Sequence, residues 1–215
     1  MRFAGQMQSW GTRSRFDNRD TEVAPSKSGV LGLVAAALGR DRTETVVDLA
    51  ALRLGVRIDR EGVLLSDYHT AQDVIRADGS GRQATALSVR HYLADAVFLV
   101  GLESEERPIL ETIDQALENP HWPLALGRRS FPPSRPVQLR PPEDPTPIFE
   151  GPLREALSEC PPLIETPAGP DVRYVVEDET GDQLWFDQPT STFAERTFTM
   201  RKVRIVVAPW GEKWS

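Results

Sequence analysis

The residues best suited to bind an anion lie in the stretch PSKSGVLGLVAAALG, at positions 25–39. Ser26, Lys27 and Ser28 stand directly before an apolar helical stripe, where the free N–H groups of a helix start attract phosphate oxygens. The glycines that precede the lysine in a nucleotide P-loop are absent, so this stretch is not a P-loop. Two interpretations stay open: a phosphate site, or an ordinary helix that Ser26 caps while Lys27 lies in solvent.

A second basic group lies in LGRRSFPPSRPV, at positions 126–137. Proline holds the backbone extended, so Arg128 and Arg129 would project at a defined angle beside Ser130. Arg13 and Arg15 lie in a polar loop that precedes the first predicted helix. Arginine makes planar, bidentate contacts with phosphates, although a solvated charged loop fits the 126–137 stretch equally well.

Metal and cofactor chemistry finds little support in the sequence. The one cysteine, Cys160, excludes an internal disulfide, and the three histidines, His69, His91 and His121, show no zinc-type spacing with it. No Asp-x-Asp or His-x-x-x-His pattern occurs. We therefore expect no metal and no cofactor.

The composition is typical of a globular protein, with 40% hydrophobic residues, 27% charged residues and a net charge of −7. Because no apolar run of about 18 residues and no basic-then-apolar leader occurs, we expect a cytoplasmic protein without membrane contact. Residues 1–140 hold 18 basic and 18 acidic side chains, whereas residues 141–215 hold 7 and 14. The acidic excess argues against simple nucleic-acid binding, but the electroneutral first part can still carry a basic groove.

The elements that position these residues follow an α+β order. The apolar pattern predicts helices and strands in alternation: a helix over 26–38, a short helix end leading into a strand over 49–58, a strand over 63–68, a buried strand over 92–102 and a helix over 107–119. Between 63–68 and 92–102 the chain is polar with GSG at its middle, which predicts a projecting hairpin or mobile loop. This order fits a split βαβ or ferredoxin-like sheet.

A composition change after PPEDPTP, at 141–147, divides the chain into two predicted parts. The first, 1–140, would be a ferredoxin-like domain. The second, 141–215, would hold a linker and a smaller β-rich region, with strands over 172–177, 184–186 and 197–207.

Five collinear motifs carry a resemblance to a known family: MQSWG at 7–11, PSKSGVLGLVAAALG at 25–39, DYHT at 67–70, RHYLADAVF at 90–98 and LGRRSFPP at 126–133. In this order they resemble the CasD family of the type I-E CRISPR Cascade complex, within the RAMP superfamily. The resemblance covers roughly residues 4–140. One departure is the start, MRFAGQMQSWG, where the family normally has several more apolar residues, so that the first strand would be cut to about three residues. Either the start codon was placed too late or the first strand is short, and we favour the first explanation because a truncated central strand would leave ladder partners unpaired.

The resemblance implies a ferredoxin-like (RRM-like) core with a thumb-like β-hairpin between about residues 67 and 92. It implies a non-catalytic subunit that caps the 5′ handle of the crRNA, contacts the backbone and large subunits, and meets target DNA through the complex. Arginine, lysine and serine side chains would grip phosphates, and tyrosines and histidines would stack on bases. The RNA-binding residues implied in this way are Arg13, Arg15, Ser26, Lys27, Ser28, Tyr68, His69, Arg90, His91, Tyr92, Arg128, Arg129 and Ser130.

Two alternatives stay open. The first is a metal-independent endoribonuclease that processes the crRNA precursor, with His69 or His91 as general base and Tyr68 or Tyr92 nearby. The chain has only three lysines, none close to these histidines in sequence, so arginines would have to supply the cation at the phosphate. The second alternative is a free-standing RNA-binding protein that needs no partner subunits.

Overall fold

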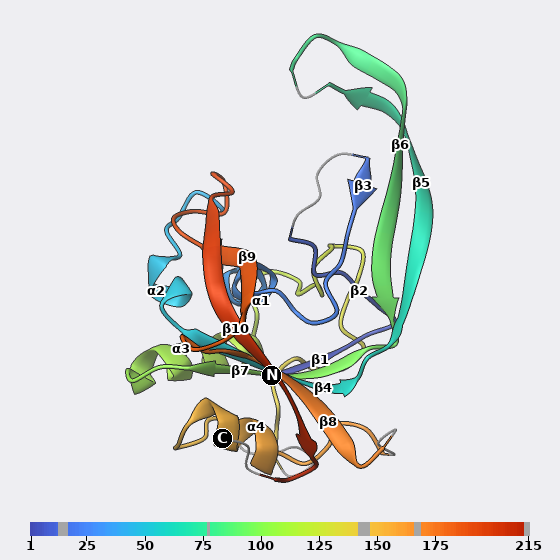
Figure 1. The fold of residues 1–215 in the computed structure, drawn as a ribbon. Helices are drawn as coiled ribbons and strands as arrows, with labels where there is room; N and C mark the ends of the chain where they lie inside the picture. The colour runs from blue at the N-terminus through green and yellow to red at the C-terminus, as the bar shows by residue number, and fades with distance from the viewer. Residues whose placement is uncertain (13–16, 77, 142–146, 166–168, 213–215) are drawn as a thin grey trace.

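A computed structural model describes residues 1–12, 17–76, 78–141, 147–165 and 169–212 (Figure 1). These residues form a mixed α/β fold built on a curled antiparallel sheet with few helices. Within the described residues, six strands make up the main sheet in the order β1-β7-β4-β8-β10-β9. Their bounds are Arg2–Ala4 (β1), Val97–Glu103 (β7), Arg53–Arg60 (β4), Asp171–Glu177 (β8), Phe198–Pro209 (β10) and Gln183–Pro189 (β9).

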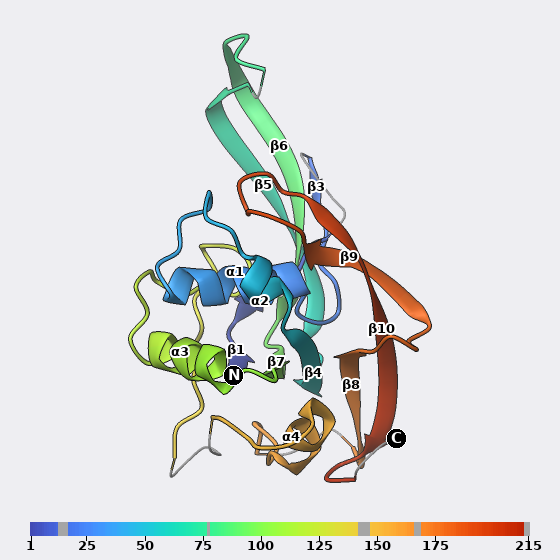
Figure 2. The ribbon, with the colours of Figure 1, turned by 90° about the vertical axis from the view of Figure 1, so that its left-hand side faces the viewer.

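One face of this sheet is covered by α1 (Lys27–Ala37) and α3 (Arg107–Glu118), which lie side by side, with the short α2 (Val47–Ala50) beside them (Figure 2). Apolar side chains from both long helices pack in one cluster with Phe98 and Val100 of β7. The cluster follows from the sequence pattern, because Val30, Leu31 and Val34 form one helical stripe. The main core therefore lies between these helices and the sheet.

The opposite face is covered by α4 (Leu153–Glu159), whose Leu153 and Leu157 pack on Leu99 and Tyr174. Glycine at Gly55 and Gly101 permits this packing, since a Cβ at either position would come within 2.8 Å of a leucine methyl of α4. Both faces of the sheet are thus covered by protein.

A buried arginine holds α4 in place. Arg57 of β4 is fully buried and forms a bidentate pair with Asp59, at 2.7 and 2.9 Å. Its remaining N–H groups donate to the carbonyls of Leu157 at 2.6 Å, of Pro161 at 2.8 Å and of Cys160. Because these carbonyls end α4 and begin the next segment, the arginine satisfies groups that a helix C-terminus leaves unpaired.

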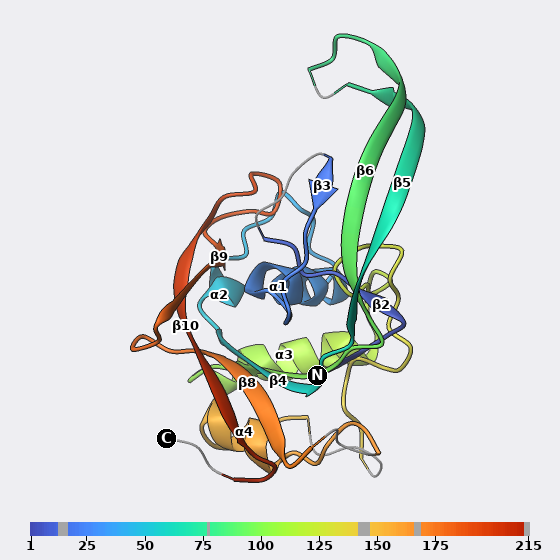
Figure 3. The same cartoon turned by 45° about the vertical axis from the view of Figure 1, so that its right-hand side comes forward.

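The second sheet contains a long hairpin that extends well beyond the rest of the molecule (Figures 1 and 3). Its strands are β5 (Val63–Ile75) and β6 (Arg82–Ala94), paired antiparallel along their length. Two short strands join β6 near its base: β2 (Met7–Gln8) runs antiparallel, and β3 (Asn18–Arg19) runs parallel. The predicted polar excursion is therefore a hairpin, longer at both ends than 67–92.

One sequence prediction needs correction. The apolar run 92–102 is two strands, not one, because Asp95 takes a left-handed conformation (φ 56°) that ends β6 before β7 begins. The division of the chain at 141–147 stays a prediction, and β8 of the C-terminal part pairs with β4 and so continues the sheet of the N-terminal part. The helices at 26–38 and 107–119 agree with α1 and α3 to within one residue at each end.

The cover formed by α4 can be tested by removing one buried side chain. We expect Leu157→Ala to lower the free energy of unfolding by about 2–5 kcal/mol, because the cavity has no side chain to fill it. Leu184→Ala is the matched control, since Leu184 is exposed and its loss should change stability by less than about 0.5 kcal/mol. Urea unfolding of the two variants measures the difference, and equal effects would contradict the packing of α4 on the sheet.

Candidate nucleic-acid interface

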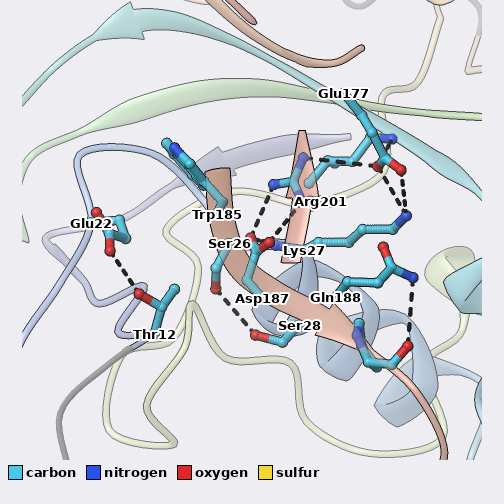
Figure 4. Close-up of polar contacts among 12 residues, drawn as sticks. Thr12, Glu22, Ser26, Lys27, Ser28, Glu177, Trp185, Asp187, Gln188 and Arg201 are labelled. Carbon is cyan, nitrogen blue, oxygen red and sulfur yellow. Dashed lines mark hydrogen bonds and ion pairs between the residues drawn. The ribbon is translucent and has the colours of Figure 1, made fainter. Parts of the chain in front are cut away.

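The start of α1 already holds an anion, and that anion belongs to the protein (Figure 4). The Lys27 backbone N–H donates to Oδ2 of Asp187 at 2.7 Å, and Ser26 Oγ accepts from the Gly29 N–H at 3.3 Å. Asp187 lies on β9 and is also paired with Arg201 of β10, at 2.7 and 3.0 Å. A carboxylate from a strand thus occupies the place where a phosphate was predicted.

The Lys27 side chain also has a partner within the protein. Its ammonium donates to both carboxylate oxygens of Glu177, at 2.9 and 3.1 Å, and the residue is 1% exposed. Burial lowers the pKa of Lys27, and the neighbouring Glu177 acts in the opposite direction. Ser26 is buried as well, so neither residue faces a ligand in solvent, and we leave both out of the proposed interface. Ser28 is half-buried, 3.5 Å from Ser26 Oγ, and its RNA contact stays a prediction.

The predicted stacking residues divide between the two faces of the hairpin. Directly paired residues share a face, and faces alternate along a strand. The register pairs His69 with Ser88, and it places Arg90 and Tyr92 on that same face of β6. Tyr68 pairs with Val89, which puts Tyr68 on the opposite face with His91. The hairpin therefore has one face with a cation and a half-buried tyrosine, and another with exposed Tyr68.

The loop that carries the second basic group is pinned against the base of this hairpin. Leu126 accepts a backbone hydrogen bond from Ser9 at 3.1 Å and donates one to Phe131 at 2.8 Å. Gly127 adopts φ +89° so close to Ser9 that a Cβ would lie 1.8 Å from the Ser9 carbonyl oxygen. Only glycine fits here, and this tight approach fixes the direction of the residues that follow.

Arg128 follows this glycine and ties the loop to the hairpin. Its Nη2 donates to the carbonyl of His91 at 2.9 Å and more weakly to the carbonyl of Arg19 at 3.4 Å. Its guanidinium lies 5.5 Å from the ring centre of Phe131, and that ring lies 5.9 Å from the ring of Tyr92. Arg129 and Ser130 are exposed beside it, as predicted for residues that project from the loop.

Arg19 completes a cluster that the sequence interpretation missed. In the register of β3 with β6, Arg19 is the strand partner of Arg90, and Arg128 donates a hydrogen bond to the backbone carbonyl of Arg19. Within the described part of the chain, no carboxylate lies within ion-pair distance of these three arginines. Burial and then the positive charges of Arg90 and Arg19 lower the pKa of Arg128, and burial and then Arg19 lower that of Arg90. The signal in the sequence is that Arg19 lies in the same polar loop as Arg13 and Arg15, both of which lie outside the described residues.

No group of three or more His, Cys, Asp or Glu side chains that could hold a metal ion occurs within the described ranges. The surface that remains is a positive one, made by Arg19, Arg90, Arg128 and exposed Arg129 beside aromatic rings. Such a combination suits contacts to phosphate groups and to unstacked bases.

A family model described as CRISPR-associated protein (Cas_Cas5) matches residues 1–204 of the chain. The chain belongs to this Cas5 family. It is 33% identical to the CRISPR system Cascade subunit CasD of Escherichia coli (strain K12) over 224 residues. The match covers 96% of this chain and 94% of that protein. The resemblance drawn from the five motifs is thereby confirmed.

Solved structures agree with this assignment. A crystal structure of a Cas protein shares 48% sequence identity with a TM-score of 0.80, covering 97% of this chain and 93% of that one. A chain of a CRISPR RNA-guided surveillance complex shares 34% identity with the same TM-score of 0.80, covering 97% and 89%. In the Cas5-family protein described here, no helix among the described residues is long and apolar enough to cross a membrane.

The internal anion at the start of α1 leads to a stability prediction for this Cas5-family protein. Asp187→Ala should lower the free energy of unfolding by about 3–5 kcal/mol, because it leaves the buried guanidinium of Arg201 and the helix N–H without their partner. Asp182→Ala, at an exposed position of the preceding turn, should change stability by less than about 0.5 kcal/mol. Thermal and urea unfolding compare the two, and an Asp187 variant as stable as the control would return the start of α1 to the list of anion sites.

Proposed function

We propose that this Cas5-family protein is a non-catalytic RNA-binding subunit of a Cascade-type CRISPR surveillance complex. In this role it caps the 5′ handle of the crRNA, contacts the backbone and large subunits, and meets target DNA through the assembled complex in the cytoplasm. The observation that carries the proposal is the arginine cluster at the base of the hairpin, next to Tyr92 and Phe131, which forms no ion pair with a carboxylate of the described residues. The relatives named as a Cascade subunit and as a CRISPR RNA-guided surveillance complex support it.

The core is proposed to be ferredoxin-like. Strands β1, β7 and β4 lie in the order 1-3-2 of that fold, all antiparallel, with α1 between β1 and β4 and α3 after β7. On the free side of β1, the Arg2 N–H donates to the carbonyl of Val137 at 2.7 Å, so the segment after α3 lies where a fourth strand would be. This order supports the split βαβ arrangement.

Because α4 covers the sheet face opposite α1 and α3, that face is not assigned to RNA. In RRM domains, RNA stacks on aromatic residues of an open sheet. Here the face opposite α1 and α3 is covered by Leu153 and Leu157, and the carbonyls that follow them are fixed by Arg57. RNA is therefore assigned to the hairpin base and to the 126–137 loop, and the hairpin takes the role of the thumb.

The two faces of the hairpin suit two different partners. The face with Arg90 and Tyr92 lies against the arginine cluster and is assigned to RNA. The other face exposes Leu64, Tyr68 and Leu87, which are 61%, 64% and 46% exposed, whereas on the Arg90 face the exposed apolar side chains Val63 and Leu65 lie near the start of β5. Apolar side chains that stay exposed on a long hairpin favour contact with another protein. We assign this face to a neighbouring protein subunit.

Arginine charge reversal tests the RNA site. The double variant Arg128→Glu/Arg129→Glu should weaken binding of crRNA handle by at least about tenfold, since charge-assisted contacts to phosphates are lost and repulsion replaces them. The control Arg154→Glu/Lys202→Glu changes the net charge by the same amount, at exposed positions on α4 and β10. Binding of labelled handle RNA to complexes assembled with partner subunits measures both. Equal affinity for the two double variants would remove the 126–137 loop from the interface.

Histidine replacement tests the absence of catalysis. The alternative needs one histidine as general base with a tyrosine nearby; His91 shares a face of the hairpin with Tyr68, and the double variant removes both possible bases. Metal-free incubation with labelled repeat RNA should give no cleavage product from either the natural chain or His69→Ala/His91→Ala. A defined cut by the natural chain that disappears in the double variant would establish the endoribonuclease instead.

A further inference from the structure

We propose that Arg19, Arg90 and Arg128 form a subsite for one phosphate group, and that an anion bound there fastens β3 to the hairpin. The inference rests on the proposed function for the source of that phosphate, the RNA backbone. It goes further by assigning Arg19 to the interface and by giving the anion a structural consequence.

The junction of β3 and β6 is electrostatically unfavourable without an anion. β3 is only two residues long, and it places Arg19 directly opposite Arg90. Like charges at directly opposed strand positions destabilise the pairing. A backbone hydrogen bond beside this pair, from the Val89 N–H to the Asp17 carbonyl at 2.7 Å, adds to the short ladder that joins the two segments. A short strand thus joins the hairpin at a point where its own side chain is repelled.

Arg128 adds a third positive charge at the same point. Its Nη2 spans the carbonyls of His91 and Arg19, one on each side of the junction. Asp67 and Asp20 are near enough to raise the pKa of Arg128, but within the described residues neither reaches ion-pair distance of it. Asp67 also lies directly opposite Arg90 in the register of β5 and β6 and raises the pKa of Arg90. Three guanidinium groups from segments around residues 19, 90 and 128 therefore converge beside carboxylates that form no ion pair with them in the described residues, which leaves a surplus of positive charge.

The chemistry of the group that fits is that of a phosphate. Within the described residues, Arg128 donates only through Nη2, which leaves Nε and Nη1 for a ligand, and Arg90 donates only through Nε, to Ser88 Oγ at 3.0 Å. Planar donor forks that come from three directions suit an oxyanion with several oxygens. The half-buried ring of Tyr92 lies on the same side, where a base attached to that phosphate would stack, while Phe131 is buried and supports Tyr92 and Arg128. A nucleic-acid phosphate explains both features.

Hydrogen exchange at Val89 measures the fastening directly, because its N–H bonds to the segment that carries β3. In the natural chain, inorganic pyrophosphate should slow this exchange several-fold, since neutralised arginines allow the strands to stay paired. Arg90→Gln should lose that response. Arg19→Gln should show slow exchange even without pyrophosphate, because the opposed charge is gone. Arg154→Gln, the control on α4, should behave like the natural chain.

A second measurement identifies the source of the phosphate. With handle RNA in complexes assembled with partner subunits, Arg19→Gln should reduce the slope of log affinity against log salt by about one, the amount for one lost phosphate contact, whereas Arg154→Gln should not. If pyrophosphate slows the exchange of the Val89 N–H while handle RNA does not bind, the subsite takes free phosphate or pyrophosphate and not the RNA backbone. That result keeps the subsite and overturns the proposed function.

The inference itself fails on a different result. RNA binding with an unchanged salt slope in Arg19→Gln, together with Val89 exchange that neither pyrophosphate nor RNA slows, would overturn the subsite and leave the proposed function standing. Slow exchange of the Val89 N–H in all variants without any anion would show that β3 and β6 pair regardless of charge. That result would also overturn the proposed subsite.

Discussion

The carboxylate of Asp187 is the contact on which the arrangement of the chain depends. It accepts from the first N–H group of α1 and from the guanidinium of Arg201, so one buried group joins a helix near residue 27 to strands near residues 187 and 201. Glu177 completes the network by accepting both hydrogen bonds of Lys27. Buried charges are tolerated only when such partners satisfy them, so the C-terminal strands must pack where they do. The sheet is therefore continuous from β1 to β9.

The local elements were predictable from the sequence, and their long-range partners were not. Helical periodicity placed α1 and α3 because Val30, Leu31 and Val34 follow the period of a helix within a few residues. The partners of Lys27 lie 150 and 160 residues away, so no local pattern could distinguish an internal anion from an external one. The same limit applies to Arg19, since its role comes from a register with β6 about 70 residues later. The residue pattern alone predicted the projecting hairpin and the basic loop, and the family resemblance assigned both to RNA, whereas the pairing that unites them appears only in the fold.

The covering of both sheet faces explains why the interface lies at an edge of the molecule. Arg57 fixes the end of α4 through three carbonyls, and the leucines of that helix fill the face that an open sheet would offer to RNA. The remaining exposed framework is the hairpin and the loop that Gly127 holds against Ser9. A rigid scaffold that presents its contacts on projecting segments is the usual arrangement for binding.

The net charge of −7 is compatible with RNA binding once the acidic groups are located. Several carboxylates of the last third are used inside the protein: Glu177 pairs with Lys27, Asp187 with Arg201, and Asp178 with Arg204. Each of these pairs is local to the C-terminal strands or the start of α1, at a distance from the hairpin junction in the fold. The described residues place no carboxylate within ion-pair distance of Arg19, Arg90 or Arg128. Because screening limits exposed charges to interactions over about 10 Å, the local surplus of positive charge governs what binds there more than the total does.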